Sequence, residues 1–370
     1  MLAVLYGSAF VAAFNENIVN VALVSIMGEF SIGAEMAQWL VTGYMIVTAI
    51  VVTATAFLSK RLRLRSLFFG AAGFLIVGSL ACMIAPVFPV LLVARLVQAI
   101  GTGIFIPAMM STVLAVAPRK RLGTYLSIGS CMITFGPAFA PVVSGLMVTA
   151  FGWRSVFLPS AVIVVLLVVC GALLIRNIAE PEQVKLDLMS VALSALGLFA
   201  LVYGLSVVTT ALPVALIAMA LGLAGIAGFV FRQRRLTHPL LDLSPLRNPR
   251  FSLACILVVV AMMTTFSMSV LLPLYFEGSL GMTAFASGAL LLVPILVNAG
   301  TALAGGRTMD RRGAWPLLPV GFALIAVGQL AICLIAPSLS WAAVLVGSIA
   351  VYAGVGLIFS PSQTAGLQTL

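Results

Sequence analysis

Charged residues are scarce in this sequence. They make up 8% of its 370 residues, whereas hydrophobic residues make up 63%. A soluble domain carries about 25% charged residues and about half apolar ones, so soluble cores could not bury this excess and lipid must act as a solvent. Alternating strand patterns are absent as well, because the apolar runs are continuous, and this excludes a membrane β-barrel. The sequence therefore predicts an all-α polytopic membrane protein.

Metal ligands and paired acids are also missing. The single histidine, His238, stands in a polar loop, and the five cysteines are scattered singly through apolar runs, so we expect no metal site and no cofactor. A membrane-embedded enzyme acting on lipid-linked substrates needs acidic pairs or histidine clusters. Glu180 and Glu182 stand alone in a polar linker. We therefore do not expect an enzyme.

Membrane-length apolar runs are what the sequence has in abundance. A span needs about 20 apolar residues. Twelve segments meet this requirement: 2–27, 37–58, 66–86, 89–116, 122–149, 154–175, 187–209, 211–231, 251–276, 284–306, 314–336 and 340–362. Several connections are very short, which predicts antiparallel helix hairpins and leaves no room for a soluble domain.

The basic residues fall on one side of these segments. All of them except Arg95 and Arg154 lie in the loops that follow the even-numbered segments, whereas Glu29, Glu35 and Glu277 lie on the opposite side. Basic loops mark the cytoplasmic side of a membrane protein. This predicts that both ends of the chain are cytoplasmic, and it explains the net charge of +10 without nucleic-acid binding.

Glu16 is the only carboxylate that lies well inside a membrane-length run, and three asparagines surround it at positions 15, 17 and 20. An ionisable group at membrane depth costs at least about 2.5 kcal/mol and therefore indicates a functional site. One interpretation is a proton carrier, since burial and a nearby cation shift the pKa of a carboxylate in opposite directions. The alternatives are a binding group for a cationic substrate and a protonated glutamate bonded to its asparagine neighbours.

Arg95 lies inside the fourth segment and also needs a partner. Glu16 is the only membrane-embedded acid available, but the segment centres place Arg95 about 10 Å nearer the outside, at 1.5 Å per residue. A contact between them needs long side chains or a bridging water. The alternative is a structural latch, in which Arg95 binds backbone carbonyls.

Two basic turns indicate repeated halves, one at 56–61 after the second segment and one at 306–313 after the tenth. Transporters built from such repeats bind substrate near the midplane between them. We predict an N-terminal six-helix bundle at 1–175, two inserted helices with linkers at 176–250, and an incomplete four-helix C-terminal bundle at 251–370.

Several motifs follow one another in a fixed order. One motif spans residues 15–23 in the first segment, and another spans residues 38–44 in the second. A third, Gly152-Trp153-Arg154, lies at the entry to the sixth segment. The fourth segment carries Arg95, Gln98, Gly101 and Gly103. The fifth segment carries Gly136, Pro137, Pro141, Ser144 and Gly145. The loop after the tenth segment carries Gly306, Asp310, Arg311 and Gly313.

These motifs resemble the fourteen-helix drug:proton antiporters of the major facilitator superfamily (EmrB/QacA type), without the last two helices. The resemblance implies that Glu16 and Arg95 serve proton coupling, that the fifth-segment set is the antiporter motif, and that the set at 306–313 is a gating loop. Many family members have aspartate at the position of Asn15. A solvated basic turn is the alternative for the gating set.

We therefore predict a monomeric, proton-coupled transporter of the bacterial cytoplasmic membrane that exports hydrophobic or amphipathic small molecules. Eight side chains are candidate cavity linings or, equally, interhelical hydrogen bonds: Asn15, Asn17, Asn20, Trp39, Tyr44, Gln98, Asn298 and Gln329. The alternatives left open are a proton symporter that imports a small solute and an inactive, truncated family member.

Overall fold

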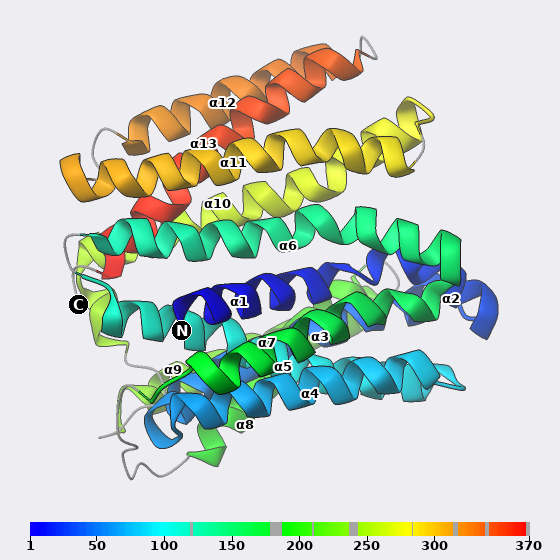
Figure 1. The fold of residues 1–370 in the computed structure, drawn as a ribbon, viewed down its shortest axis with the longest axis horizontal. Coiled ribbons are helices and arrows are strands. Elements are labelled where there is room, and N and C mark those ends of the chain that lie inside the picture. Colours follow the sequence, from blue (N-terminus) through cyan, green and yellow to red (C-terminus); the bar gives the residue numbers. More distant parts are fainter. Residues whose placement is uncertain are drawn as a thin grey trace. The chain divides into compact units, whose positions relative to one another are not determined.

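The computed structural model describes residues 1–118, 121–177, 187–208, 211–236, 243–282, 284–313, 317–336 and 340–367. Regular structure in these ranges is helical (Figure 1). The α-helices are α1 (Leu2–Asn17), α2 (Leu23–Phe30), α3 (Ala34–Arg61), α4 (Leu64–Ile84), α5 (Phe88–Val116), α6 (Leu122–Phe151), α7 (Phe157–Leu174), α8 (Leu188–Ser206), α9 (Leu212–Gln233), α10 (Pro249–Pro273), α11 (Ala284–Arg312), α12 (Leu317–Ile335) and α13 (Trp341–Leu367). The short turns are the 3-10 helices η1 (Asn20–Ala22), η3 (Trp153–Val156) and η4 (Ser244–Arg247), and the π-helical η5 (Leu274–Ser279).

Within the described ranges, twelve helical segments are long and apolar enough to cross a membrane. The first, Leu2–Phe30, combines α1, η1 and α2, and each of the other α-helices contributes one. This confirms the predicted fold class and the twelve predicted segments, whose ends shift by a few residues.

Packing divides the chain into two compact units. The first comprises Met1–Ser111 and Ala150–Leu243, and the second comprises Thr112–Thr149 and Ser244–Leu370. The first unit therefore contains α1–α4, most of α5, and α7–α9, whereas nearly all of α6 packs with α10–α13. The domain limits predicted above describe repeated halves rather than packing, and they stay a prediction.

In the first unit, α8 and α9 form a close hairpin. A Cβ on Gly225 of α9 would lie 2.9 Å from the Cα of Gly197 in α8, so only glycine allows this approach. Asp187 precedes α8 and accepts hydrogen bonds from Arg232 of α9, at 2.6 Å from Nε and 2.9 Å from Nη2. The glycines and this ion pair hold the two helices together.

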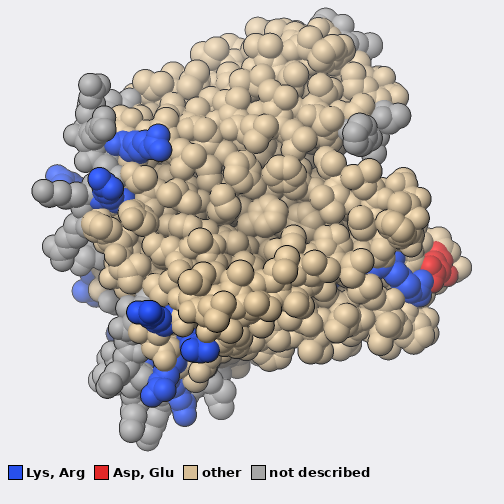
Figure 2. Space-filling model, in the orientation of Figure 1, with Lys and Arg blue, Asp and Glu red and all other residues tan. Residues whose placement is uncertain are grey.

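Most basic side chains of the first unit that are visible in Figure 2 gather at one end of its helices. At this end, Arg65 of α4 donates through Nη2 to the carbonyl of Ala172 in α7, at 3.2 Å. At the other end, Arg154 pairs with Glu29, and Trp153 donates to the second oxygen of the same carboxylate, each at 2.5 Å. The one loop cation that the sequence places on the opposite side thus has an acidic partner there.

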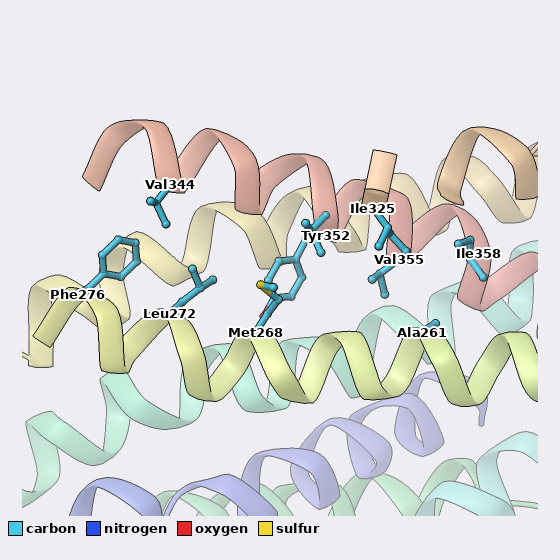
Figure 3. Close-up of a cluster of buried hydrophobic side chains, with 10 residues drawn as sticks. Ala261, Met268, Leu272, Phe276, Ile325, Val344, Tyr352, Val355 and Ile358 are labelled. Carbon is cyan, nitrogen blue, oxygen red and sulfur yellow. The ribbon is translucent and has the colours of Figure 1, made fainter. Parts of the chain in front are cut away.

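The core of the second unit lies between α10 and α13 (Figure 3). Its members on α10 and η5 are spaced by seven, four and four residues, so they form one stripe along the helix. The buried side chains of this core are Ala261, Met268, Leu272, Phe276, Ile325, Val344, Val351, Tyr352, Val355 and Ile358. Because α13 also packs against α11 and α12, it connects α10, α11 and α12.

Candidate functional site

The first membrane span is interrupted one residue after Glu16. α1 ends at Asn17, residues 18 and 19 form a turn, and η1 and α2 follow. Asparagine amides compete with the backbone for hydrogen bonds, and Asn17 Nδ2 donates to the carbonyl of Ala13 at 3.1 Å. Asn17 therefore weakens the helix where it stops. Ile18 and Val19 keep right-handed helical dihedrals, so the interruption changes the hydrogen bonding of the span and not its helical sense.

Arg95 of α5 contacts this interruption. Its side chain is fully buried, and Nη2 donates to the backbone carbonyl of Glu16 at 3.3 Å. The last carbonyls of a helix lack the partners that a continuing helix would supply, and a guanidinium can satisfy one of them.

Tyr44 of α3 covers one face of the guanidinium. The Cζ of Arg95 lies 4.0 Å from the centroid of the Tyr44 ring, within the range of a cation–π interaction. The Tyr44 hydroxyl accepts a hydrogen bond from Asn15 Nδ2 at 3.0 Å and shares another with Thr102 Oγ1 at 2.5 Å. All four side chains are fully buried, so Tyr44 connects α1, α3 and α5 around the arginine.

Gln98 holds the guanidinium from the same helix. Arg95 Nη1 donates to Gln98 Oε1 at 2.9 Å, and Gln98 Nε2 donates to Ser79 Oγ of α4 at 2.7 Å. The thiol of Cys82 also lies 3.9 Å from Gln98 Oε1. The Nε of Arg95 has no partner among the described residues. Arg95 is thus held by carbonyl dipoles and an aromatic face rather than by a carboxylate.

The Glu16 carboxylate makes no hydrogen bond or ion pair with any described residue. The two ion pairs in the described ranges are Arg154–Glu29 and Arg232–Asp187. Glu16 is half-buried, and Asn20, four residues further along, is exposed. A partly accessible carboxylate beside a buried arginine can take up and release a proton. The structure therefore has the carbonyl contact that the sequence offered as the alternative to an acid–arginine pair.

Sequence reasoning missed Ser79 and Thr102. Thr102 lies between Gly101 and Gly103, two glycines of the predicted arginine motif. A Cβ on Gly103 would lie 2.9 Å from the carbonyl oxygen of Thr48 in α3, so the glycine allows α3 to approach α5 and Thr102 to reach Tyr44. A polar residue flanked by glycines in an apolar helix was the available signal.

Comparison with known proteins then gives the family. A model described as Major Facilitator Superfamily matches residues 5–370. The chain belongs to this superfamily. It is 32% identical over 369 residues to the lincomycin resistance protein LmrB of Bacillus subtilis (strain 168), covering 98% of this chain and 77% of the relative. It is 30% identical over 364 residues to the methylenomycin A resistance protein of Streptomyces coelicolor, covering 96% and 75%. The predicted membership is confirmed.

A solved structure supports the fold of this superfamily member. The proton:xylose symporter XylE bound to 6-bromo-6-deoxy-D-glucose aligns over 98% of this chain and 80% of its own, with a TM-score of 0.67. The two sequences are 14% identical, so this likeness concerns the fold alone.

Three predicted cavity residues of this superfamily member lie outside the Arg95 network. Trp39 stacks on Phe199 and Tyr203 of α8, with ring centroids 6.1 and 6.5 Å apart, and so joins α3 to the α8–α9 hairpin. In the second unit, Asn298 is buried in α11 and Gln329 is exposed on α12. Their assignment to a substrate cavity stays a prediction.

The residues predicted as the antiporter motif lie in α6. Pro137 and Pro141 are inside the helix, where each removes a backbone hydrogen bond, and Gly136 and Ser144 are buried. A Cβ on Gly145 would meet nothing within 4 Å. This composition allows α6 to bend, and its part in transport stays a prediction.

The predicted gating motif begins where α11 packs against α6. A Cβ on Gly306 would collide with the hydroxyl of Ser127, so the two helices touch at this point. Gly313 follows α11 with a φ of 78°, a conformation that favours glycine. The side chains of two other motif residues lie outside the described part of the chain: Asp310 and Arg311. The gating role stays a prediction.

Proposed function

We propose that this member of the superfamily exports hydrophobic or amphipathic drugs in exchange for protons, by alternating access. The Glu16 carboxylate carries the proposal. It lies in a membrane span, beside a backbone interruption and a buried arginine, and it has no ion-pair partner among the described residues. Carboxylates in such positions serve proton relays in pumps and transporters. The names of the relatives, which refer to lincomycin and methylenomycin A resistance, support antibiotics as the cargo.

In this cycle, Glu16 takes up a proton while it is exposed to the outside and releases it to the cytoplasm. Protonation removes a charge from membrane depth and so lowers the cost of closing the site, whereas deprotonation restores the charge and favours reopening. The proton gradient supplies the energy. We place the protein in the bacterial plasma membrane as a monomer, with both ends of this chain cytoplasmic, because the basic loops lie on that side.

Inverted membrane vesicles test the coupling. Vesicles with the wild-type protein are expected to accumulate radiolabelled lincomycin when their interior is acidified. Glu16→Gln cannot exchange a proton and is expected to fall to the level of vesicles without the protein, while still exchanging labelled for unlabelled drug. Glu29→Gln is the matched control, because Glu29 lies outside the Arg95 network, and it is expected to accumulate drug like the wild type.

Full accumulation by Glu16→Gln at every pH would contradict the coupling role. A wild-type protein that accumulates no drug under any gradient would contradict export itself.

A further inference from the structure

Tyr44 combines two sets of contacts that meet at no other residue of this network. Its ring faces the Arg95 guanidinium, and its hydroxyl bonds to Asn15 and Thr102. We propose that Tyr44 is a positioning residue, which holds Arg95 against the Glu16 backbone carbonyl and so keeps the Glu16 carboxylate free to exchange a proton. This inference rests on the proposed function, because it concerns the same acid.

The Tyr44 ring and the Arg95 guanidinium attract each other. Both side chains are fully buried, so water does not screen the interaction. The other contacts of Arg95 are with neutral groups, namely Gln98 Oε1 and the Glu16 carbonyl. The Tyr44 face therefore adds a further contact that resists movement of the cation toward a carboxylate.

Two hydrogen bonds fix the orientation of the Tyr44 ring. A phenol that bonds to α1 through Asn15 and to α5 through Thr102 cannot turn away from Arg95 without losing both hydrogen bonds. The Oδ1 of Asn15 has no partner among the described residues, so its amide is oriented through Tyr44. The ring, the amide and the hydroxyl thus hold one another in place.

The Arg95 guanidinium binds the backbone carbonyl of Glu16, the residue that also carries the carboxylate. A guanidinium that leaves this carbonyl therefore has the carboxylate as the neighbouring acceptor. The titratable or charged groups around this point are Tyr44 of α3, Cys82 of α4 and Arg95 of α5, and of these only arginine is charged near neutral pH. Without the Tyr44 face, Arg95 is free to pair with the carboxylate and hold it ionised.

Infrared titration of the purified full chain in lipid nanodiscs measures this directly. The band of the protonated Glu16 carboxyl is identified by its absence in Glu16→Gln, and its midpoint pH is compared between variants. An opposite charge that comes within hydrogen-bonding distance moves such a midpoint by about 1 to 3 pH units. Tyr44→Leu, which removes the ring, is expected to titrate at least about one pH unit lower than the wild type.

Two further variants sharpen the result. Tyr44→Phe keeps the ring but loses both hydrogen bonds, and is expected to shift in the same direction by a smaller amount. Because it removes a single atom, it remains available if Tyr44→Leu does not fold. Tyr352→Leu, a buried tyrosine in the other unit, is the matched control and is expected to leave the midpoint unchanged.

An unchanged midpoint in whichever Tyr44 variant folds would overturn the inference, and so would a shift to higher pH. The titration does not depend on transport. If the wild type transports no drug but Tyr44→Leu still titrates lower, the proposed function fails while the positioning role stands.

Discussion

Replacing Gly306 with alanine tests how closely α6 and α11 pack. The added Cβ would collide with the hydroxyl of Ser127 and lie 2.7 Å from both the Ser127 Cβ and the carbonyl oxygen of Gly123. A hydroxyl can rotate away, but a Cβ and a backbone oxygen cannot. The helices must therefore separate. Overpacking of this kind costs about 1–3 kcal/mol.

Unfolding by sodium dodecyl sulfate in mixed micelles measures this loss. Gly300→Ala is the matched control, because it lies on the same helix and its Cβ would meet nothing within 4 Å. Alanine at an open helical position is expected to be neutral or to stabilise by up to about 1 kcal/mol. Gly306→Ala should therefore be less stable than Gly300→Ala by about 1–3 kcal/mol.

A second background identifies the cause of the loss. Ser127→Gly removes two of the three close contacts at Gly306 and leaves the Gly123 oxygen, so Gly306→Ala should cost less in that background than in the wild type. Equal stability of Gly306→Ala and Gly300→Ala would refute the close approach of α6 and α11.

Two further predictions concern the α8–α9 pair. Trp39→Leu removes the stack on Phe199 and is expected to lower the free energy of unfolding by about 0.5–1.5 kcal/mol, whereas Trp341→Leu at an exposed position is expected to cost less; equal losses would contradict a role for the stack. The hydrogen bond from Arg232 lowers the pKa of Asp187 from 3.8 to about 2. The stabilisation by this pair is therefore complete above pH 3.8 and is lost as the pH falls through about 2. Hydrogen exchange at the joined ends of α8 and α9 should accelerate over that pH interval in the wild type. The same acceleration in Asp187→Asn would contradict a stabilising role for the Asp187–Arg232 pair.

The twelve spans and their order could be predicted because a bilayer offers the backbone no water. Each span must satisfy its own hydrogen bonds and present apolar side chains, so length and hydropathy are sufficient. The grouping of basic loops follows from the same separation of lipid and water. Arg154, the exception in the predicted pattern, has an acidic partner in Glu29, a pairing that we did not predict from the sequence.

The contacts of Arg95 could not be predicted in the same way. α5 has 29 residues, which corresponds to about 44 Å and exceeds the hydrocarbon core of about 30 Å, so the centre of its apolar run is a poor measure of depth. Ser79 and Thr102 carried little signal, because serine and threonine in membrane helices commonly bond to carbonyls of their own helix. Ser79 does so with Leu75 at 2.7 Å, in addition to its bond with Gln98.

The position of the acid explains why Arg95 and Glu16 meet through the backbone. The resemblance to the antiporters places the common acid at Asn15, and in this chain the Asn15 side chain is fully buried and bonds to Tyr44 in the arginine network. Successive residues of an α-helix point about 100° apart, since a turn takes 3.6 residues. An acid displaced by one residue therefore leaves the buried network and is only partly buried, while its carbonyl stays within reach of Arg95. The displacement separates the two groups that the sequence had considered as one ion pair. Arg95 binds the Glu16 carbonyl near the end of α1, and the carboxylate lies outside the hydrogen-bonded network.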